Sequence, residues 1–377
     1  MEKKIAFLMG NPLSTGGVEV VTKNLISKLL NANLPIWGII ATVKQSQKEK
    51  EKYLSDNKNF KIIFSPIEEI NEILKKNKIT HLIIQQLNIK EIKSVIEIID
   101  NKEIRIIPFL HGTPNIYLQK FSFNNNWLTK AKNYIKDLIG YKSKIAKNNI
   151  SIFNYILENC FRFIIVSNQS KAELIKITQK EHQYKIQSIY NIVPIIDSNA
   201  NSKENIIISA GRLVYNKGVY HSLPYIAKVM KQFPSWKYLI IGNGPEYEKI
   251  NSYITKHNCT NIFLLGETSN DRVHYYLRRS KICLLYSLYE GLPTILIEAG
   301  KYNNALIAYK SPGGGGRDII SQNINGFIVK NHNEIQNILT NLLSNPHLLA
   351  KIANGNAKII SKFDEQEIIK KWCNILN

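Results

Sequence analysis

Two positively charged side chains stand close together in the second half of the chain. Arg212 and Lys217 lie within the run Gly211 to Gly218, directly after an apolar run that predicts a strand. A guanidinium offers a planar fork of donors and an ammonium offers a compact charge, so the two together suit a diphosphate. The bracketing glycines would let the backbone approach such a ligand. This segment therefore predicts an anion-binding site at the end of a strand.

A pair of glutamates follows another predicted strand. Glu290 and Glu298 are separated by seven residues, and Pro293 between them predicts a helix that begins at about Gly291. The free N–H groups at a helix start bind phosphate, while carboxylates accept hydrogen bonds from sugar or ribose hydroxyls. A surface helix with two solvated glutamates would not explain the Gly and Pro beside Glu290. The pattern indicates a ligand that carries both phosphate and hydroxyl groups.

The first half of the chain offers two further candidates. Gly16 and Gly17 follow the first predicted strand and precede a helix, which favours phosphate binding, although a plain tight turn explains the pair equally well. His111 follows the predicted strand 104–110, at the sheet edge where open α/β folds bind ligands. An isolated histidine is more often structural, so both roles stay open for His111.

The elements that must position these residues form an α/β pattern. Short apolar runs alternate with helical stretches, which predicts parallel sheets with crossover helices. The 377 residues exceed the roughly 250–300 at which a single core stops growing, so we expect two domains. A polar segment without periodicity, residues 194–204, separates them. We expect one domain at 1–196, a second at 197–355 and a C-terminal helix at 356–377.

The charge composition of the chain limits the classes of binding partner that we expect but does not choose among them. Lys and Arg number 50 against 29 Asp and Glu, a formal net charge of +21. This excess predicts attraction to nucleic acid, lipid headgroups or phosphorylated small molecules, while compositional drift on solvated faces explains it equally well. The four cysteines have neither metal-ligand spacing nor the density of a disulfide framework, which favours reduced thiols in the cytosol. No apolar run is long enough for a signal peptide or a bilayer span.

A basic segment, residues 117–159, interleaves lysines with aromatic and aliphatic side chains. Such a segment suits the surface of an anionic membrane. It suits equally well a helical excursion whose apolar face packs on its own domain. Both interpretations predict a cytoplasmic protein, and the first adds a peripheral position at the inner face of the cytoplasmic membrane.

Taken together, these motifs resemble those of glycosyltransferase family 4, whose GT-B fold has two Rossmann-like domains facing each other across a cleft. The resemblance rests on Gly16-Gly17-Val18-Glu19, His111-Gly112, the Gly-Arg-Leu-x-x-x-Lys-Gly form of 211–218, Gly242-x-Gly-Pro, and the spacing of Glu290 and Glu298. The ordered set is specific, whereas each motif alone is not. It covers most of the chain and is strongest between residues 209 and 329.

The resemblance implies a retaining enzyme that moves a hexose or N-acetylhexosamine from a nucleotide-diphosphate sugar, by default a UDP-sugar, without a metal or other cofactor. No Asp-x-Asp metal signature occurs in the sequence, which agrees. The catalytic residues that it implies are His111, Arg212, Lys217 and Glu290. The residues that it assigns to the donor are Gly16, Gly17, Arg212, Lys217, Gly242, Gly266, Glu290, Gly291, Leu292, Pro293, Thr294 and Glu298.

The resemblance further implies a glycan or lipid-linked acceptor, a role in bacterial lipopolysaccharide, capsule or surface polysaccharide synthesis, and a C-terminal helix that crosses back to the N-terminal domain. Two other interpretations stay open. One is a nucleotide-sugar 2-epimerase-like enzyme of the same fold, against which the paired cations and paired glutamates argue. The other is a basic nucleic-acid-binding protein, for which no aromatic RNA platform, helix-turn-helix or zinc signature is evident.

Overall fold

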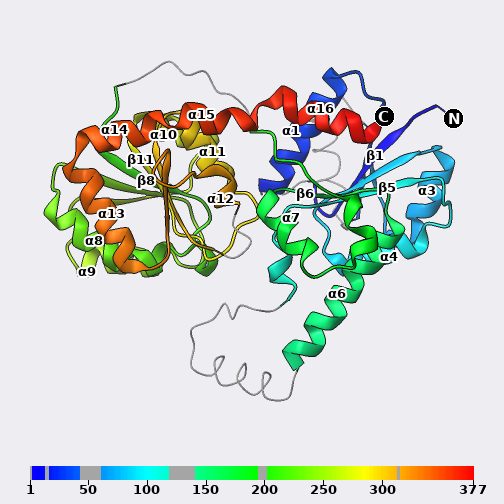
Figure 1. Cartoon of the computed structure of the whole chain (residues 1–377), viewed down its shortest axis with the longest axis horizontal. Coiled ribbons are helices and arrows are strands. Elements are labelled where there is room, and N and C mark those ends of the chain that lie inside the picture. Colours follow the sequence, from blue (N-terminus) through cyan, green and yellow to red (C-terminus); the bar gives the residue numbers. More distant parts are fainter. Residues whose placement is uncertain (1, 13–16, 43–60, 119–140, 194–201, 312–314) are drawn as a thin grey trace. The chain divides into compact units, whose positions relative to one another are not determined.

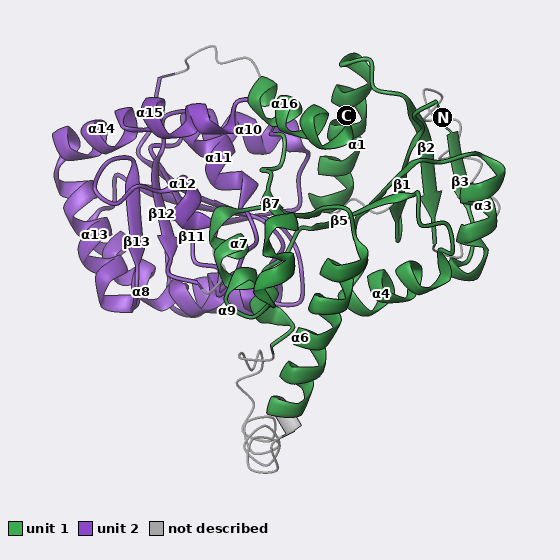
Figure 2. Ribbon diagram, turned by 45° about the vertical axis from the view of Figure 1, so that its right-hand side comes forward, with its two compact units in different colours: residues 1–121, 131–192, 365–377 green, residues 122–130, 193–364 purple. Residues whose placement is uncertain are grey.

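The computed structural model describes residues 2–12, 17–42, 61–118, 141–193, 202–311 and 315–377. These residues form two compact units, each built around one parallel sheet (Figures 1 and 2). Of the described residues, unit 1 holds those up to Ile192 together with Glu365–Asn377, and unit 2 holds Val193–Asp364. The sequence analysis divided the chain at 196 and 355. The predicted fold class, two Rossmann-like α/β domains, is confirmed.

Unit 1 has a seven-stranded sheet in the order β3-β2-β1-β4-β5-β6-β7, and each described pairing in it is parallel. Its strands are β1 (Ile5–Met9), β2 (Ile36–Ala41), β3 (Lys61–Phe64), β4 (His81–Ile84), β5 (Arg105–Leu110), β6 (Phe163–Ile165) and β7 (Ile186–Ser188). Its described helices are α1 (Gly17–Asn31), η1 (Ile67–Glu69), α3 (Ile70–Lys76), α4 (Ile89–Ile98), η2 (Pro114–Ile116), α6 (Tyr141–Asn159), α7 (Asn168–Ile175), η3 (Lys180–Lys185) and α16 (Glu365–Leu376). The predicted basic segment 117–159 lies partly outside the described residues, and its described part includes α6.

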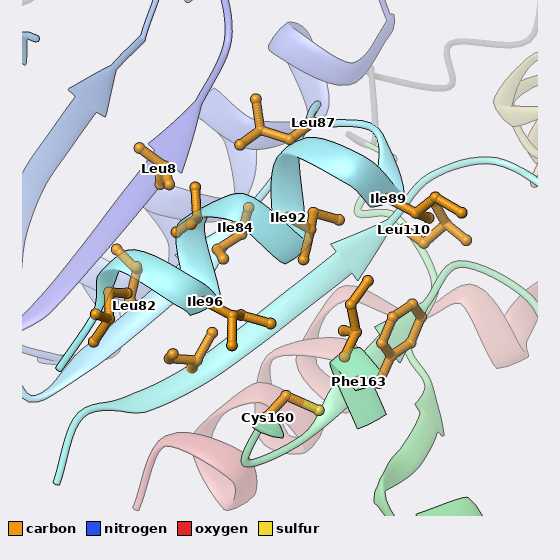
Figure 3. Packing of buried hydrophobic residues seen from close by; sticks show 14 of the residues in the cluster. Leu8, Leu82, Ile84, Leu87, Ile89, Ile92, Ile96, Leu110, Cys160 and Phe163 are labelled. Carbon is orange, nitrogen blue, oxygen red and sulfur yellow. The ribbon is translucent and has the colours of Figure 1, made fainter. Parts of the chain in front are cut away.

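The core of unit 1 shows why the sequence forms these layers. Helix α4 begins at a capping box, in which the Asn88 side chain accepts from the Lys90 and Glu91 amides and the Glu91 carboxylate accepts from the Asn88 amide. Helical spacing then places Ile92 and Ile96 on one face, where they pack with buried side chains of the strands (Figure 3). Strand β1 is buried at all five residues, as expected of a parallel sheet covered on both faces.

The C-terminal helix α16 belongs to unit 1, where it packs against α1. Trp372 is 1% exposed, and its ring meets Phe109 of β5 edge to face with ring centroids 5.3 Å apart. Lys28 of α1 and Glu365 form an ion pair at 2.6 Å. Two ends of the chain that are far apart in sequence therefore build one core, and α16 supports the strand that precedes His111.

The segment 356–377, expected to be one helix, contains a break. Helix α15 (Asn356–Ile360) and the turn η5 (Ser361–Phe363) come first, and Asp364 then takes an extended conformation before α16 begins. Phe363 is 1% exposed, so the turn is fixed by a buried aromatic side chain. The amphipathic pattern predicted the helices correctly but did not show this break, because both pieces present apolar residues at helical spacing.

Unit 2 has a six-stranded sheet in the order β10-β9-β8-β11-β12-β13, again with each described pairing parallel. Its strands are β8 (Ile206–Ala210), β9 (Lys237–Ile241), β10 (Ile262–Gly266), β11 (Ile282–Leu285), β12 (Ala305–Tyr309) and β13 (Gly326–Val329). Its described helices are η4 (Tyr215–Lys217), α8 (Val219–Gln232), α9 (Tyr247–Lys256), α10 (Asn270–Arg279), α11 (Thr294–Lys301), α12 (Gly316–Ile319), α13 (His332–Ser344), α14 (Pro346–Asn354), α15 and η5.

The helix expected to begin at about Gly291 begins three residues later. Helix α11 starts at Thr294, and Pro293 is its N-cap with φ −76° and ψ 93°. The proline ring disfavours helical backbone in the residue before it, so Leu292 cannot join the helix. The Gly291–Pro293 stretch is consequently a loop that precedes the helix, and the amides at the helix start are those from Thr294 onward.

Candidate active site

The order of each sheet reverses at one point, and this point is where open α/β folds bind ligands. In unit 2 the reversal lies between β8 and β11, which are paired neighbours although β9 and β10 come between them in sequence. A pocket opens there at the carboxyl end of β8, and its lining includes Ser209, Gly211, Arg212, Lys217 and Tyr286. The two cations singled out in the sequence therefore line a single pocket.

One of the residues that line this pocket, Lys217, contacts Glu290. Lys217 Nζ donates to Glu290 Oε1 at 2.5 Å, and the side chains are 30% and 14% exposed. Glu290 lies in the loop before α11, whereas Lys217 ends η4. The fold thus brings together a cation and a carboxylate that are 73 positions apart in the chain. Arg212 is exposed and has no described ion pair, so its guanidinium is available to an anion.

Two glycines hold the backbone of this pocket in place. Gly218 has φ +65°, and a Cβ there would lie 2.2 Å from the Tyr286 carbonyl oxygen. Gly242 has φ +138°, and a Cβ there would lie 1.9 Å from the Gly211 carbonyl oxygen. Both positions therefore need glycine for space as well as for conformation. The Gly242 amide also donates to the Gly266 carbonyl at 2.8 Å, which joins two residues of the predicted donor set.

Glu298 lies within α11 and is mostly buried, with a side chain 20% exposed. Burial raises the pKa of the Glu298 carboxyl, and a hydrogen bond with the Thr294 side chain opposes that rise. His274 of α10 places Nε2 4.0 Å from Glu298 Oε2. Tyr302 Oη lies 3.2 Å from the other ring nitrogen, Nδ1. If the Tyr302 hydroxyl donates there, the His274 hydrogen sits on Nε2 and faces the carboxylate.

His274 is neutral in this arrangement, because burial, followed by the nearby Arg278 charge, lowers its pKa. Its effect on Glu298 is therefore that of a dipole and not of a counter-charge. Sequence reasoning did not identify His274 as a site residue. It lies inside a helix four residues after Asn270, with no glycine or proline beside it to mark a ligand site.

In unit 1 the residues at the corresponding sheet edge are linked by hydrogen bonds. His111 follows β5, and its Nε2 lies 3.0 Å from Gln85 Oε1. Because that partner is an oxygen, Nε2 carries the hydrogen. The Thr22 hydroxyl of α1 lies 2.5 Å from the same oxygen. Gln85 directly follows the buried strand β4, so a polar residue at a strand end was the sequence signal that could have identified it.

Burial lowers the pKa of His111 to about 3, and a contact with the Asn191 side chain opposes that shift. His111 Nδ1 and Asn191 Oδ1 nevertheless make no hydrogen bond of normal geometry with the described residues, and both atoms are buried. Phe109 packs on the His111 ring with centroids 4.1 Å apart. His111 is therefore a neutral histidine at physiological pH, held by its neighbours with one nitrogen engaged and the other inside the protein.

The remaining predicted positions fall in three places. Gly16 lies outside the described residues, and Gly17 is the first residue of α1. Glu19 in the first turn of α1 is 5% exposed and accepts a hydrogen bond from the Gln86 side chain. In unit 2 the described structure groups Arg212, Lys217 and Glu290, and it places Gly242 and Gly266 at neighbouring strand ends. Gly291, Leu292, Pro293, Thr294 and Glu298 lie on the loop and helix that follow Glu290.

Within the described ranges, no group of three or more His, Cys, Asp or Glu side chains is arranged to hold a metal ion. Among the described helices, none has the length and apolarity needed to cross a bilayer.

Comparison with known families points to one class of enzyme. Residues 195–359 match the profile of the family described as Glycosyl transferases group 1. This range contains the pocket, the Lys217–Glu290 pair and Glu298. The match therefore falls on the part of the chain where the candidate site residues of unit 2 gather.

Individual relatives agree with the family profile. An uncharacterized glycosyltransferase of Haemophilus influenzae is 24% identical over 99% of this chain and 100% of that protein. A poly(ribitol-phosphate) alpha-N-acetylglucosaminyltransferase of Staphylococcus aureus is 28% identical over 59% of this chain, and the match spans 46% of that longer protein. The crystal structure of Anabaena HepE in complex with UDP has a TM-score of 0.75 and 15% identity, covering 99% of each chain. This last likeness shows that the two units form a GT-B fold.

Proposed function

Since the chain is a glycosyltransferase that resembles family 4, we propose that it is a retaining enzyme that transfers a hexose or N-acetylhexosamine from a nucleotide-diphosphate sugar. The observation that carries the proposal is the pocket at the β8/β11 reversal, which Arg212 and Lys217 line, together with the pairing of Lys217 with Glu290. UDP is the expected nucleotide, and the UDP complex of HepE supports it. The proposed acceptor is a glycan or a lipid-linked glycan of a bacterial surface polysaccharide, and the name of the Staphylococcus aureus relative supports a polymeric acceptor.

Arg212 and Lys217 bind the donor diphosphate in this proposal. As the bond from the sugar C1 to the phosphate oxygen breaks, negative charge grows on the diphosphate, and cations already in place stabilise it without reorganisation. The amides at the start of α11 add partial positive charge. Lys217 is held by Glu290 before the donor arrives, so donor binding exchanges one anionic partner of Lys217 for another.

The two glutamates recognise hydroxyl groups in this proposal. Glu290 accepts hydrogen bonds from the transferred sugar, and Glu298 accepts from the ribose. The Lys217–Glu290 contact couples the two tasks, because a sugar that engages Glu290 releases Lys217 towards the phosphate. A donor with both parts in place is therefore bound in the geometry that favours bond breaking.

The acceptor hydroxyl attacks C1 on the face that the diphosphate leaves, so the anomeric configuration is retained. A new bond forms between the acceptor oxygen and C1, and the hydroxyl proton passes to an oxygen of the leaving diphosphate. His111 is an unsuitable proton acceptor at neutral pH, because Nε2 carries its hydrogen to Gln85 and Nδ1 is buried. His111 is expected beside the transferred sugar as a neutral group, and no metal ion takes part in the proposed step.

Calorimetric titration with UDP, GDP and ADP tests the donor site first. We expect one diphosphate, UDP, to bind, and Arg212→Ala and Glu298→Ala each to weaken that binding at least tenfold. Lys351→Ala and Glu248→Ala, which remove exposed charges from α14 and α9, serve as matched controls and should bind like the wild type. Binding of none of the three nucleotides would contradict the proposal.

Turnover tests the reaction itself. Incubation with UDP-sugars and a bacterial glycan extract, with and without EDTA, should release UDP in both cases and yield an axial or equatorial linkage that matches the donor. Loss of turnover with EDTA would contradict the metal-independent step. A free sugar epimer in place of a glycoside would indicate the epimerase interpretation.

A further inference from the structure

A second hollow lies in unit 2, away from the donor pocket. It has a volume of about 590 Å³, and its lining includes Lys237 and Phe263 together with Leu265, Arg272 and Tyr275. It reaches Ile206 and Lys237, the first residues of β8 and β9, whereas Arg212 follows the carboxyl end of β8. A five-residue strand is roughly 17 Å long. The hollow is therefore a separate feature, which we call the β10 groove.

The β10 groove gathers large apolar side chains that are exposed among the described residues. Phe263, Leu265 and Tyr275 are 39%, 39% and 42% exposed. They make up half of the six large hydrophobic residues that are exposed among the described residues. Contiguous exposed apolar surface of this kind marks a binding site more often than scattered single residues do.

The sheet topology explains how these side chains come to lie away from the core of unit 2. Strand β10 is one of the two edge strands of this sheet, and its residues alternate between faces. Ile262 and Leu264 point to the face that forms the core of unit 2, so Phe263 and Leu265 point to the other face. Helix α10 packs on β8 and α11, with Leu277 buried, and it forms one wall of the groove beside the strands.

The charged groups around these rings are mainly cationic. Lys237, Arg272 and Arg279 line the groove against a single carboxylate among its lining residues, Glu204. Glu204 is ion-paired with Arg279, whose guanidinium also lies 5.1 Å from the centroid of the Tyr275 ring. Lys237 and Arg272 have no described ion pair, so the groove presents net positive charge beside aromatic rings.

We propose that the β10 groove binds an acidic glycan chain, meaning a saccharide whose units carry carboxylate or phosphate groups. The apolar C–H face of a sugar ring stacks on an aromatic side chain, and an arginine fork pairs with a carboxylate or phosphate through two hydrogen bonds. The volume lies within the roughly 300–1,000 Å³ of small-ligand sites. The groove would hold the chain on unit 2 while the donor reacts elsewhere, which would keep an acceptor or product polymer associated with the enzyme.

A glycan fits the groove better than a membrane does. A bilayer is engaged by apolar side chains that project from the surface, whereas Phe263 and Leu265 line a recess together with α10. The basic groove also disfavours cationic peptides. An acidic chain matches both its shape and its charge.

Binding of a galacturonic acid decamer to the purified full chain tests the proposal. We expect measurable affinity that falls with added salt, and at least a tenfold increase in Kd for the double variant Arg272→Ala/Tyr275→Ala. Maltoheptaose, a neutral chain, should bind at least tenfold more weakly than the decamer. Tyr184→Ala, which removes an exposed tyrosine from unit 1, is the matched control and should bind like the wild type.

UDP titration of the same variants separates this proposal from the donor site. Unchanged UDP binding in the double variant would show that unit 2 is intact. If UDP does not bind even the wild type, the proposed donor site fails, and the decamer measurement still tests the β10 groove. Equal decamer affinity in the double variant and the wild type would overturn the proposal. Binding to phosphatidylglycerol vesicles that depends on Arg272 and Tyr275, with no decamer binding, would overturn it in favour of a membrane surface.

Discussion

The carboxyl edges of the two sheets carry opposite kinds of chemistry on the same topology. In unit 2 the edge holds charged groups, with Arg212 exposed and Lys217 paired to Glu290. In unit 1 the groups around His111 are neutral, with His111, Gln85 and Thr22 joined in a largely buried hydrogen-bond network. The same topology thus carries different side chains in the two units, and among the described residues the permanent positive charge lies at the unit 2 edge, the edge that our proposal assigns to the donor diphosphate.

The largest expected effect comes from removing a cation on the charged edge. Lys217→Ala should lower kcat by about 10²–10³-fold, the usual cost of losing one group that stabilises developing negative charge. It also leaves the largely buried Glu290 carboxylate without its cation. Steady-state kinetics with saturating acceptor would measure the loss. A variant with a wild-type kcat would show that Lys217 is not part of the reaction.

A double-variant cycle sharpens this prediction. Glu290→Gln alone should also lower kcat, and the two losses should not add in Lys217→Ala/Glu290→Gln, because the residues act as one contact. Additive losses would mean that Lys217 and Glu290 work independently. Lys351→Ala provides the control for a lost positive charge in unit 2.

Substitutions at the unit 1 edge should change the stability of the protein as well as its activity. Gln85→Leu removes the partner of His111 Nε2, whereas the Thr22 hydroxyl keeps a second acceptor, the Val18 carbonyl. A buried polar group left without a partner costs about 1–3 kcal/mol. We expect a lower melting temperature together with a lower kcat. Gln85→Glu keeps an oxygen in place and should recover part of both. A Gln85→Leu enzyme with an unchanged melting temperature would contradict the buried network.

The pH dependence of folding stability gives a further test of the unit 1 edge, because His111 binds a proton less readily in the folded chain than in the unfolded chain. Its pKa in the folded chain, about 3, lies below the ordinary value of 6.5. The unfolded chain therefore binds a proton first as pH falls, so the contribution of neutral His111 is complete above about pH 6.5 and is lost progressively between that value and pH 3. The slope is at most about 1.4 kcal/mol per pH unit for one group. His81, with a pKa of about 4, adds to the same trend.

Melting temperatures at pH 7.5, 6.0 and 5.0 would measure this loss. His111→Gln should flatten the acid dependence, whereas His347→Gln, at an exposed position, should leave it as it is in the wild type. An unchanged slope in His111→Gln would show that His111 is accessible to protons in the folded chain.

The difference between the two edges also explains what the sequence could predict. Local signals identified the fold class and the charged edge, because Gly, Pro, Arg and Glu stand next to one another in the chain where strands end. The pairing of Lys217 with Glu290 depends on β11 lying beside β8, which spacing alone does not show. Pro293 was recognised as a helix-start signal, but its role as the cap and not the first helical residue required the backbone angles.

Partners that act from other elements were beyond local reasoning. Gln85 comes from β4 and Thr22 from α1, and neither adjoins His111 in sequence. His274 reaches Glu298 from α10 for the same reason. Long-range contacts of this kind are fixed by packing, so they follow from the three-dimensional arrangement and not from motif spacing.

The smallest expected effect concerns this last contact. His274→Leu removes the ring nitrogen that lies 4.0 Å from Glu298 Oε2 but leaves the carboxylate and both cations of the pocket in place. Because a neutral dipole 4.0 Å away contributes less than a charge, we expect the donor KM to rise about three- to fivefold, near 1 kcal/mol or less, with kcat nearly unchanged. His274→Gln should recover part of the loss through its amide hydrogens, and Tyr302→Phe should give an intermediate value by freeing the other ring nitrogen. A His274→Leu enzyme with reduced kcat and unchanged KM would place His274 with the reacting groups and not with ribose recognition, and the charged edge would then extend farther along α10 than the present contacts indicate.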